Sequence, residues 1–559
     1  MRQRHSGIAT TELFLLVVMI LATGMATATA QATVNVPDAM AEDTCVTCGD
    51  GPTGGCTSIM AGREATTDGS VITAHTCDGN YRTWLDIVPS EHHSAGAARE
   101  VYWGKLHNET PWDMRGLRLK GEIPQADSTF AYFNVAYPAM NEKGLSIGET
   151  TIGGRNELRN PEGLFLIENL QAIALERTTN ARDAIRLIGE LVAEYGYGDW
   201  GECLTFADAR EVWHFEIQGA GPFELGAVWA AVRIPDDHVG VSANIPRIST
   251  LDLNNPDYYM ASDNVHSLAE EMGWWDPDSG EEFKFWKAYS GRTPFSIREF
   301  FILSNMAPSL NLLRDQDELP FSVKPDEQVS VRDVMSFYRE TYEGTEYDMT
   351  RNLMVQPQRR RGQPEPTEEV GMVKSPVVNN WTVGGEMANL LNTLKPGTVE
   401  TQRAIAIARC SYSQIIQNRG WLPPEIGTVA WFSFDNPGQS PRIPIFAGTL
   451  SLPNSFAVCG QHSYREDAAV WWFRRTNRLA MIRWSEVRDI IEGASMDFED
   501  RAFAELPSIE SIAMEYYNNG QYDQFRQYIT KYSNDFAHAT MTKWWELGND
   551  LWTRYARGF

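Results

Sequence analysis

The amino-acid sequence changes character abruptly at Cys56, and this change constrains the fold more than any other feature. Residues 31–55 are small, acidic and rich in Gly, Thr and Ala, so they cannot build a hydrophobic core. Residues 57–61 and 70–74 have the composition of β-strands, and Asp68-Gly69 between them is a hairpin turn signal. The ordered protein is therefore predicted to begin with a β-hairpin whose first residue is a cysteine.

The first thirty residues have the layout of an export signal. Arg2 and Arg4 form a basic start, Leu13 to Leu21 is an apolar run, and Ala28-Thr29-Ala30 offers the small residues that signal peptidase recognises. The run is shorter than the roughly 20 residues that a membrane span needs. We expect a signal peptide over 1–30 and a secreted or periplasmic protein. An N-terminal anchor that is never cleaved is the alternative.

Beyond the hairpin, strand and helix signals follow one another in blocks. Strands are predicted over 130–135 and 144–152, followed by two helices over 164–176 and 180–195. Further strands are predicted over 203–243, and the C-terminal part over 465–559 is predicted to be helical. Such an order is typical of a layered α+β protein. We therefore expect a connector or propeptide over 31–55, a catalytic domain with insertions over 56–464, and a helical region packed on it. Aromatic residues in that helical region are expected to be core rather than a carbohydrate-binding face.

Composition excludes several classes of protein. The 559 residues carry a net charge of −26, and 43% are hydrophobic, so the chain can bury a core and is not disordered overall. The one dense basic run, Arg359-Arg360-Arg361, does not make a nucleic-acid groove. An acidic chain also avoids anionic lipids, so we expect no stable membrane contact after signal cleavage. The sequence permits a homo-oligomer.

Seven cysteines are too few for a disulfide-stapled scaffold of this length. Cys45-x-x-Cys48 lacks the second pair that a zinc site requires. The sequence contains no HExxH motif, no GxSxG motif and no Walker A loop. No metal and no organic cofactor are therefore expected.

Cys56 is the residue with the clearest chemical potential. A thiol is a strong nucleophile once it loses its proton, and a free α-amine on the same residue can accept that proton. Cleavage between Gly55 and Cys56 would create such an amine. A buried structural cysteine is the alternative. A lipoprotein cysteine is set aside, because about 25 residues separate Cys56 from the apolar run.

Several segments in the right order resemble one enzyme family, the cysteine dipeptidases of the dipeptidase A type. The segments are Cys56–Gly79, Met140–Thr151, Phe206–Glu216, Val228–Ile248, Tyr342–Thr350, Ser411–Trp431 and Pro441–Gly448. These enzymes are N-terminal-nucleophile (Ntn) hydrolases, related to choloylglycine hydrolases and penicillin V acylases. The resemblance implies an αββα sandwich with a helical C-terminal extension, and hydrolysis of small peptides through an S-acyl intermediate.

The resemblance also implies site residues. Cys56 would be the nucleophile, Asp78 would hold its amine and thiol, and Asn244 would donate to the oxyanion. Thr151 falls where relatives place another site residue. His75 stands where relatives commonly carry arginine, and this difference puts a fixed positive charge beside the thiol in doubt.

Two further positions are interpreted less specifically. Cys77 is either a packed core thiol or a second sulfur able to oxidise with Cys56. Arg409 corresponds loosely to a structural arginine near the nucleophile of related enzymes.

Two other functions remain as alternatives to a dipeptidase. One is an N-acyl amidase of the penicillin V acylase or bile salt hydrolase type, which would share the scaffold. The other is a non-catalytic exported binding protein in which Cys56 is structural. It predicts that the connector persists and that Cys56→Ala changes only packing.

Overall fold

The computed structural model describes residues 55–290, 295–356, 371–381 and 383–556, all within one structural unit, Thr47–Phe559. The predicted signal segment, the connector up to Gly54, Cys45-x-x-Cys48 and Arg359-Arg360-Arg361 lie outside these residues.

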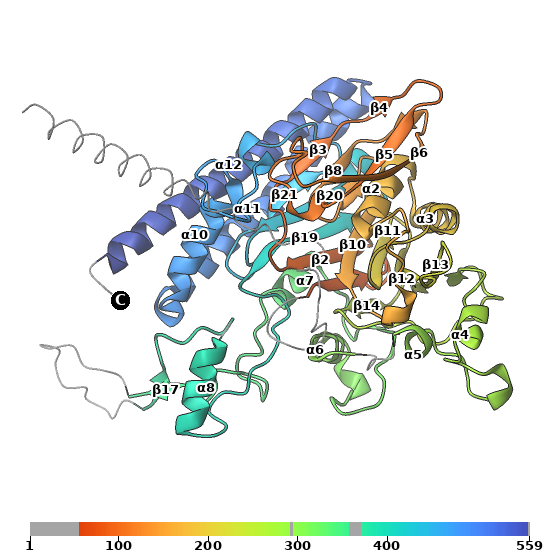
Figure 1. Ribbon diagram of the computed structural model, residues 1–559. Helices are drawn as coiled ribbons and strands as arrows, with labels where there is room; N and C mark the ends of the chain where they lie inside the picture. Colours follow the sequence, from red (N-terminus) through yellow and green to blue (C-terminus); the bar gives the residue numbers. More distant parts are fainter. Residues whose placement is uncertain (1–54, 291–294, 357–370, 382, 557–559) are drawn as a thin grey trace, which may run out of the picture. The chain divides into compact units, whose positions relative to one another are not determined.

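Two antiparallel sheets form the centre of the described chain (Figure 1). The first sheet has, in spatial order, β16 (Ser322–Val323), β14 (Val239–Ser242), β1 (Thr57–Ala61), β2 (Val71–Asp78), β19 (Cys410–Asn418), β20 (Thr428–Phe434) and β21 (Ile443–Phe446). The second has β15 (Tyr259–Ala261), β13 (Ala227–Ile234), β12 (Val212–Gly219), β11 (Glu202–Ala207), β10 (Ser146–Thr151), β9 (Met140–Asn141), β8 (Tyr132–Asn134) and β3 (Asp86–Val88). The predicted first hairpin, β1 and β2, is confirmed.

The two sheets face each other, because β2 packs across β10 and β11. Every residue of β2 and of β12 is buried, as expected for strands covered on both faces. Polar side chains cross the interface between the sheets: Thr73 and Thr205 share a hydrogen bond of 2.6 Å between their hydroxyls. This part of the interior is therefore suited to holding polar groups.

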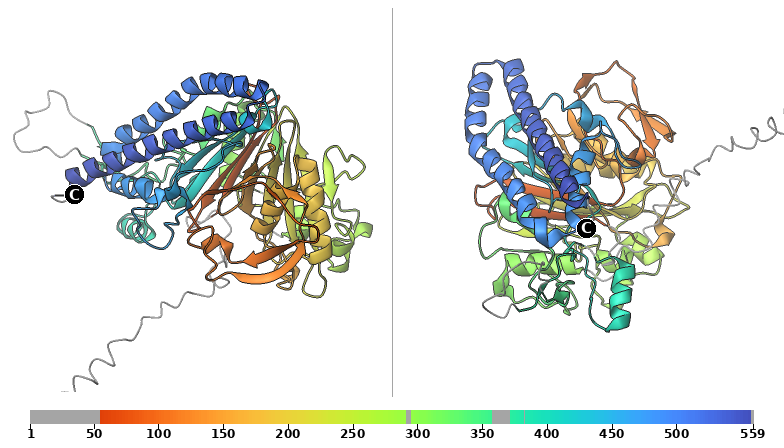
Figure 2. Two further views of the ribbon diagram at one scale, coloured as in Figure 1. Left: turned by 90° about the horizontal axis from the view of Figure 1, so that it is seen from above. Right: turned by 90° about the vertical axis from the view of Figure 1, so that its left-hand side faces the viewer.

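Helices cover the outer faces of both sheets (Figure 2). On the second sheet, α2 (Ile167–Arg177) packs on β8, and α3 (Ala181–Tyr195) packs on β11, β12 and β13. The predicted start of α3 is confirmed, since the Asn180 side chain accepts from the backbone N–H of Asp183 at 3.0 Å. The α+β class is thus confirmed.

The first sheet is covered by helices from two parts of the chain. The elements α6 (Ile297–Met306) and α7 (Val331–Phe337) contact β14 and β19, whereas α10 (Ala469–Met481), α11 (Trp484–Asn518) and α12 (Tyr522–Tyr555) contact β20 and β21. The predicted break between the last two helices lies where Gly520 takes φ 71°. Trp544 and Tyr555 are buried, as predicted for core aromatics, whereas Trp552 on the same helix is 61% exposed.

The remaining helices and strands lie outside the two large sheets, and six of the strands pair in three separate two-stranded sheets, β4 with β7, β5 with β6 and β17 with β18. They are β4 (Glu91–His92), β5 (Ala98–Trp103), β6 (Arg118–Pro124), β7 (Ser128–Thr129), α4 (Ser267–Glu271), α5 (Phe285–Tyr289), β17 (Met354–Val355), β18 (Val373–Lys374), α8 (Gly385–Leu394) and α9 (Pro424–Gly427). Among the described residues, no helix is both long enough and apolar enough to cross a bilayer.

Candidate active site

Cys56 directly precedes β1, and the residue before it is held in a conformation that only glycine adopts easily. Gly55 donates its backbone N–H to the Asp78 carbonyl at the end of β2, at 3.2 Å. Its φ is 104°, and a Cβ at this position would lie 2.2 Å from Asn244 Oδ1. The Gly55–Cys56 peptide is therefore fixed in one place, and a larger residue before the cysteine would be strained.

Two buried arginines bind the backbone carbonyl groups of Gly55 and Cys56. Arg403 Nη2 donates to the Gly55 carbonyl at 2.5 Å and to Asp78 Oδ2 at 2.7 Å. Arg298, from α6, donates through Nη1 to the Cys56 carbonyl at 2.7 Å. Positive charge thus lies on both sides of the Gly55–Cys56 bond, where it can stabilise negative charge that develops on a carbonyl oxygen.

Neither arginine was predicted from the sequence. The interpretation of Arg409 as the arginine near the nucleophile is wrong: Arg409 is exposed, and Arg403 occupies that place with its side chain fully buried. A signal was present, because Arg403 precedes the apolar run Ala404–Ala408 and Arg298 stands in the apolar segment of α6. An arginine within such a run needs buried partners.

Asp78, Asn244 and Thr151 lie together around the same bond, as the resemblance predicts. Asp78 pairs with Arg403 and accepts from Thr76 Oγ1 at 3.0 Å. Asn244 Nδ2 donates to the Thr151 carbonyl at 2.7 Å, and its Oδ1 accepts from Arg298 at 3.0 and 3.1 Å. The Asn244 amide is therefore held firmly beside Gly55.

His75 also lies in the site, on β2, but it does not carry a charge there. Burial lowers the pKa of its imidazole to about 4. Nδ1 lies 2.6 Å from the Glu149 carbonyl, and Nε2 has no hydrogen-bond partner among the described residues. His75 supplies no fixed charge, but Arg298 and Arg403 place positive charge beside Cys56.

Because His75 is neutral in the fold, we expect the free energy of unfolding to depend on pH. Its pKa is 6.5 in an unfolded chain and about 4 in the fold, so the unfolded state binds more protons between these values. The free energy of unfolding should therefore fall as the pH drops from 6.5 to 4. His75→Gln should make this dependence shallower in urea titrations, whereas His538→Gln on the exposed face of α12 should keep it. An unchanged slope in His75→Gln would contradict the buried neutral state.

The Cys56 thiol is 2% exposed and lies beside a second thiol. A hydrogen bond with Cys77, then burial and the nearby charge of Glu149, raise the pKa of Cys56 well above its usual value. Both cysteines are free and buried, and their thiols lie in hydrogen-bond contact. While Cys56 remains joined to Gly55, its thiol therefore stays protonated at neutral pH and needs a base.

Glu149 on β10 and Glu202 on β11 add two acidic groups that sequence analysis missed. Glu149 contacts Cys56, and ligand atoms of Cys56, His75 and Glu149 all lie within 4.8 Å of one another. Glu149 lies inside Met140–Thr151, one of the segments that carry the resemblance, but a strand alone does not indicate which residue of the other sheet it will face.

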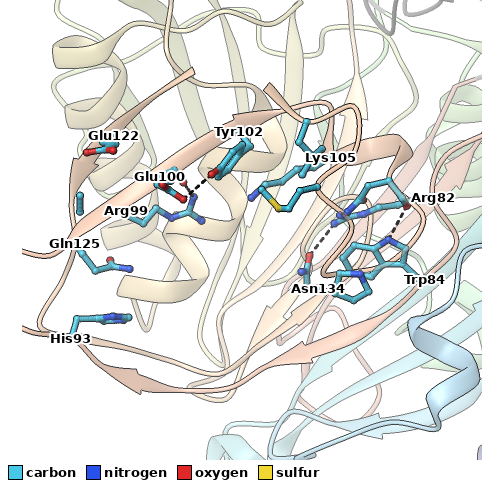
Figure 3. Close-up of a pocket in the computed structure, with 15 residues that line it drawn as sticks. Arg82, Trp84, His93, Arg99, Glu100, Tyr102, Lys105, Glu122, Gln125 and Asn134 are labelled. Atoms are coloured by element: carbon cyan, nitrogen blue, oxygen red, sulfur yellow. Dashed lines mark hydrogen bonds between the residues drawn. The ribbon is translucent and has the colours of Figure 1, made fainter. Parts of the chain in front are cut away.

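A cavity of about 530 Å³ lies apart from these residues, beside the β5–β6 hairpin (Figure 3). Arg82, Arg99 and Lys105 line it, and Figure 3 shows Arg82 next to Trp84 at one end. None of the five predicted site residues lines this cavity. The candidate active site is therefore the closed cluster at Cys56, not the open cavity.

Comparison with known proteins identifies the family of this chain. A sequence model of peptidase family C69 matches residues 55–497, beginning one residue before Cys56. The chain belongs to peptidase family C69. Two relatives named probable dipeptidase are similar to this C69 chain. One, from Latilactobacillus sakei, is 25% identical over 76% of this chain and 80% of its own. The other, from Salmonella dublin, is 27% identical over 70% of this chain and 81% of its own.

A third relative, named probable dipeptidase B, comes from Lactococcus lactis and is 24% identical over 72% of this chain and 76% of its own. The resemblance to cysteine dipeptidases seen in the sequence motifs is thus confirmed, and so is the assignment of this C69 member to the cysteine peptidases. The alternative of a non-catalytic binding protein loses its basis.

Proposed function

We propose that this C69 peptidase is an exported dipeptidase of the Ntn type, whose mature chain begins at Cys56. The observation that carries the proposal is the environment of the Gly55–Cys56 peptide, where Arg403 binds the Gly55 carbonyl and Arg298 binds the Cys56 carbonyl. The two packed sheets with helices on their outer faces support an αββα Ntn sandwich. The names of the relatives support dipeptides as substrates.

In this proposal the Cys56 amine accepts the thiol proton, and Sγ attacks the carbonyl carbon of the dipeptide. The C–N bond breaks, and the leaving amine takes a proton from the Cys56 ammonium. Water then hydrolyses the thioester, which releases the second amino acid and restores the thiol. Asn244 and Arg403 are the groups placed to stabilise the oxyanion, and Asp78 orients the amine.

The same thiol is proposed to cleave the connector. Sγ attacks the Gly55 carbonyl carbon, the proton passes to the departing Cys56 nitrogen, and water hydrolyses the resulting thioester. Arg403 already donates to the Gly55 carbonyl, which supports this step. Export through the 1–30 signal would bring the chain to the compartment where this occurs.

The N-terminal sequence and intact mass of the protein from the exported fraction test this proposal, together with hydrolysis of Ala-Ala and penicillin V. A chain that begins at Cys56 and cleaves Ala-Ala is expected. A chain that begins near Gln31 would exclude the Ntn mechanism. Cleavage of penicillin V but not Ala-Ala would indicate the N-acyl amidase instead.

Gly55→Ala should slow the removal of the connector by roughly tenfold or more, because the added Cβ meets Asn244 and the positive φ is strained. The rate is measured by following the mass of the chain after synthesis. Gly69→Ala is the matched control, since Gly69 has φ 81° but no atom within 4 Å of an added Cβ. Equal rates for the two variants would show that the geometry at Gly55 does not govern cleavage.

A further inference from the structure

Glu149 and Glu202 form a buried acidic pair beside the nucleophile. Glu149 is fully buried, Glu202 is 4% exposed, and their carboxyl groups lie on neighbouring strands within hydrogen-bonding reach of each other. Among the described residues, no Lys, Arg or His forms an ion pair with either of them. Asp78, in contrast, is paired with Arg403. Buried acids without a cation are unfavourable, so a charge that arrives with a ligand would compensate them.

Glu149 loses its proton more readily than Glu202, because the pKa of Glu149 is raised to about 7 and that of Glu202 is raised well above its usual value. Burial is the main cause that raises the pKa of both carboxyl groups, and the charge of Glu149 raises that of Glu202 further. Glu202 therefore holds the proton, while Thr151 Oγ1 donates to Glu149 Oε1 at 3.3 Å. One oxygen of the more acidic carboxyl group, Glu149 Oε2, thus remains without a hydrogen-bond partner among the described residues.

We propose that Glu149 binds the free α-ammonium group of the dipeptide substrate and so determines the specificity of the site for unblocked dipeptides. This inference rests on the proposed function. Neither the family nor the names of the relatives say which residue binds this ammonium group.

Bond lengths allow the ammonium group to reach Glu149. In a dipeptide, the ammonium nitrogen is two bonds from the scissile carbonyl carbon, about 2.5 Å away. The attacking sulfur stands about 3–3.5 Å from that carbon. The nitrogen therefore lies within roughly 6 Å of Cys56 Sγ. A Glu149 carboxylate oxygen lies within 4.8 Å of the same sulfur, so it can reach the nitrogen at ion-pair distance.

This arrangement also separates the two candidate substrate classes. An N-acyl substrate presents a neutral acyl group at this place and would leave the Glu149 charge buried without a partner. A site built to pair with a polar group discriminates strongly against an analogue that lacks it. The acidic pair therefore favours dipeptides over penicillin V and bile salts.

The test compares Ala-Ala with propionyl-alanine, which differs only in lacking the ammonium group. The wild-type enzyme should have a kcat/KM at least about 10²-fold higher for Ala-Ala. Glu149→Gln should lower kcat/KM for Ala-Ala by roughly 10²–10³-fold, mainly through KM, and leave propionyl-alanine unchanged or improved. The preference for the free ammonium should then nearly disappear.

Glu168→Gln in α2 is the matched control, because Glu168 is a buried acid whose carboxyl oxygens also have no hydrogen-bond partner among the described residues. It should keep the wild-type preference. The rate at which iodoacetamide alkylates Cys56 separates binding from proton transfer. If Glu149 binds substrate and is not the base, Glu149→Gln should not slow alkylation, because the charge of Glu149 raises the pKa of the Cys56 thiol and its removal favours the thiolate.

Three results would overturn the inference. The first is an equal kcat/KM of the wild-type enzyme for the two substrates. The second is an undiminished kcat/KM of Glu149→Gln for Ala-Ala. The third is an equal loss of kcat/KM for both substrates in Glu149→Gln, together with slower alkylation of Cys56. The wild-type comparison needs no variant to fold. A wild-type enzyme that begins at Cys56 but cleaves neither substrate would overturn the proposed function itself, and this inference with it.

Discussion

Replacing Cys56 with alanine is expected to lower kcat/KM for Ala-Ala by roughly 10⁴-fold or more, because the atom that forms the thioester is lost. The variant should also keep its connector, since the proposed attack on the Gly55 carbonyl needs the same sulfur. Both effects are measured on one preparation, by product release and by intact mass. Alanine removes a single buried sulfur, so the thermal midpoint should change little compared with these losses.

Cys459→Ala is the matched control for this experiment. Cys459 is also a free, fully buried thiol, but its partners are the Thr83 hydroxyl and the backbone N–H of Gln461. It should retain both activity and maturation. If Cys56→Ala still matures, another protease removes the connector, and if it still hydrolyses Ala-Ala, Cys56 is not the nucleophile.

Arg403→Leu is expected to lower the free energy of unfolding by about 3–5 kcal/mol. The change leaves Asp78 with its charge buried, because both side chains of this pair are 0% exposed and the remaining donor Thr76 is neutral. Urea denaturation followed by tryptophan fluorescence measures the effect. The loss should become smaller when Asp78→Asn is added, since the amide carries no charge that needs a partner.

Arg115→Leu offers the comparison. Arg115 also pairs with an aspartate, Asp113, at 2.9 Å, but its side chain is 83% exposed. Surface pairs of this kind contribute little to stability, so the urea midpoint should not move. Equal midpoints for Arg403→Leu and the wild type would show that the Arg403–Asp78 pair is not needed to hold the site together.

Local signals in the sequence were sufficient to predict most of the central strands and helices. The Asp68-Gly69 turn and the Asn180 cap act through bonds within a few residues, so composition alone indicates them. The predicted helix over 164–176 is less accurate. Its first residues are drawn out of the helix by backbone contacts with a distant segment, where Leu164 donates to the Tyr195 carbonyl and Phe165 bridges to Tyr197.

Those residues of the site that lie in sequence motifs could be predicted. Cys56 and Asp78 are 22 residues apart on one hairpin, and Asn244 follows the adjacent strand β14. Arg298 and Arg403 come from segments hundreds of residues away in the chain. Glu149 belongs to the opposite sheet. Which distant charges meet is decided by how the layers pack, and no local pattern encodes it.

The position of β1 within its sheet has a consequence for how this protein can be produced. β1 lies between β14 and β2 and is hydrogen-bonded to both, so a chain beginning at Cys56 starts at an interior strand. Most chain ends fray, but this one would be anchored from its second residue onward. A gene that begins at the Cys56 codon would therefore depend on complete removal of the initiator methionine, because one retained residue would fill the place of Gly55. Any purification tag on the N-terminal side would leave with the connector.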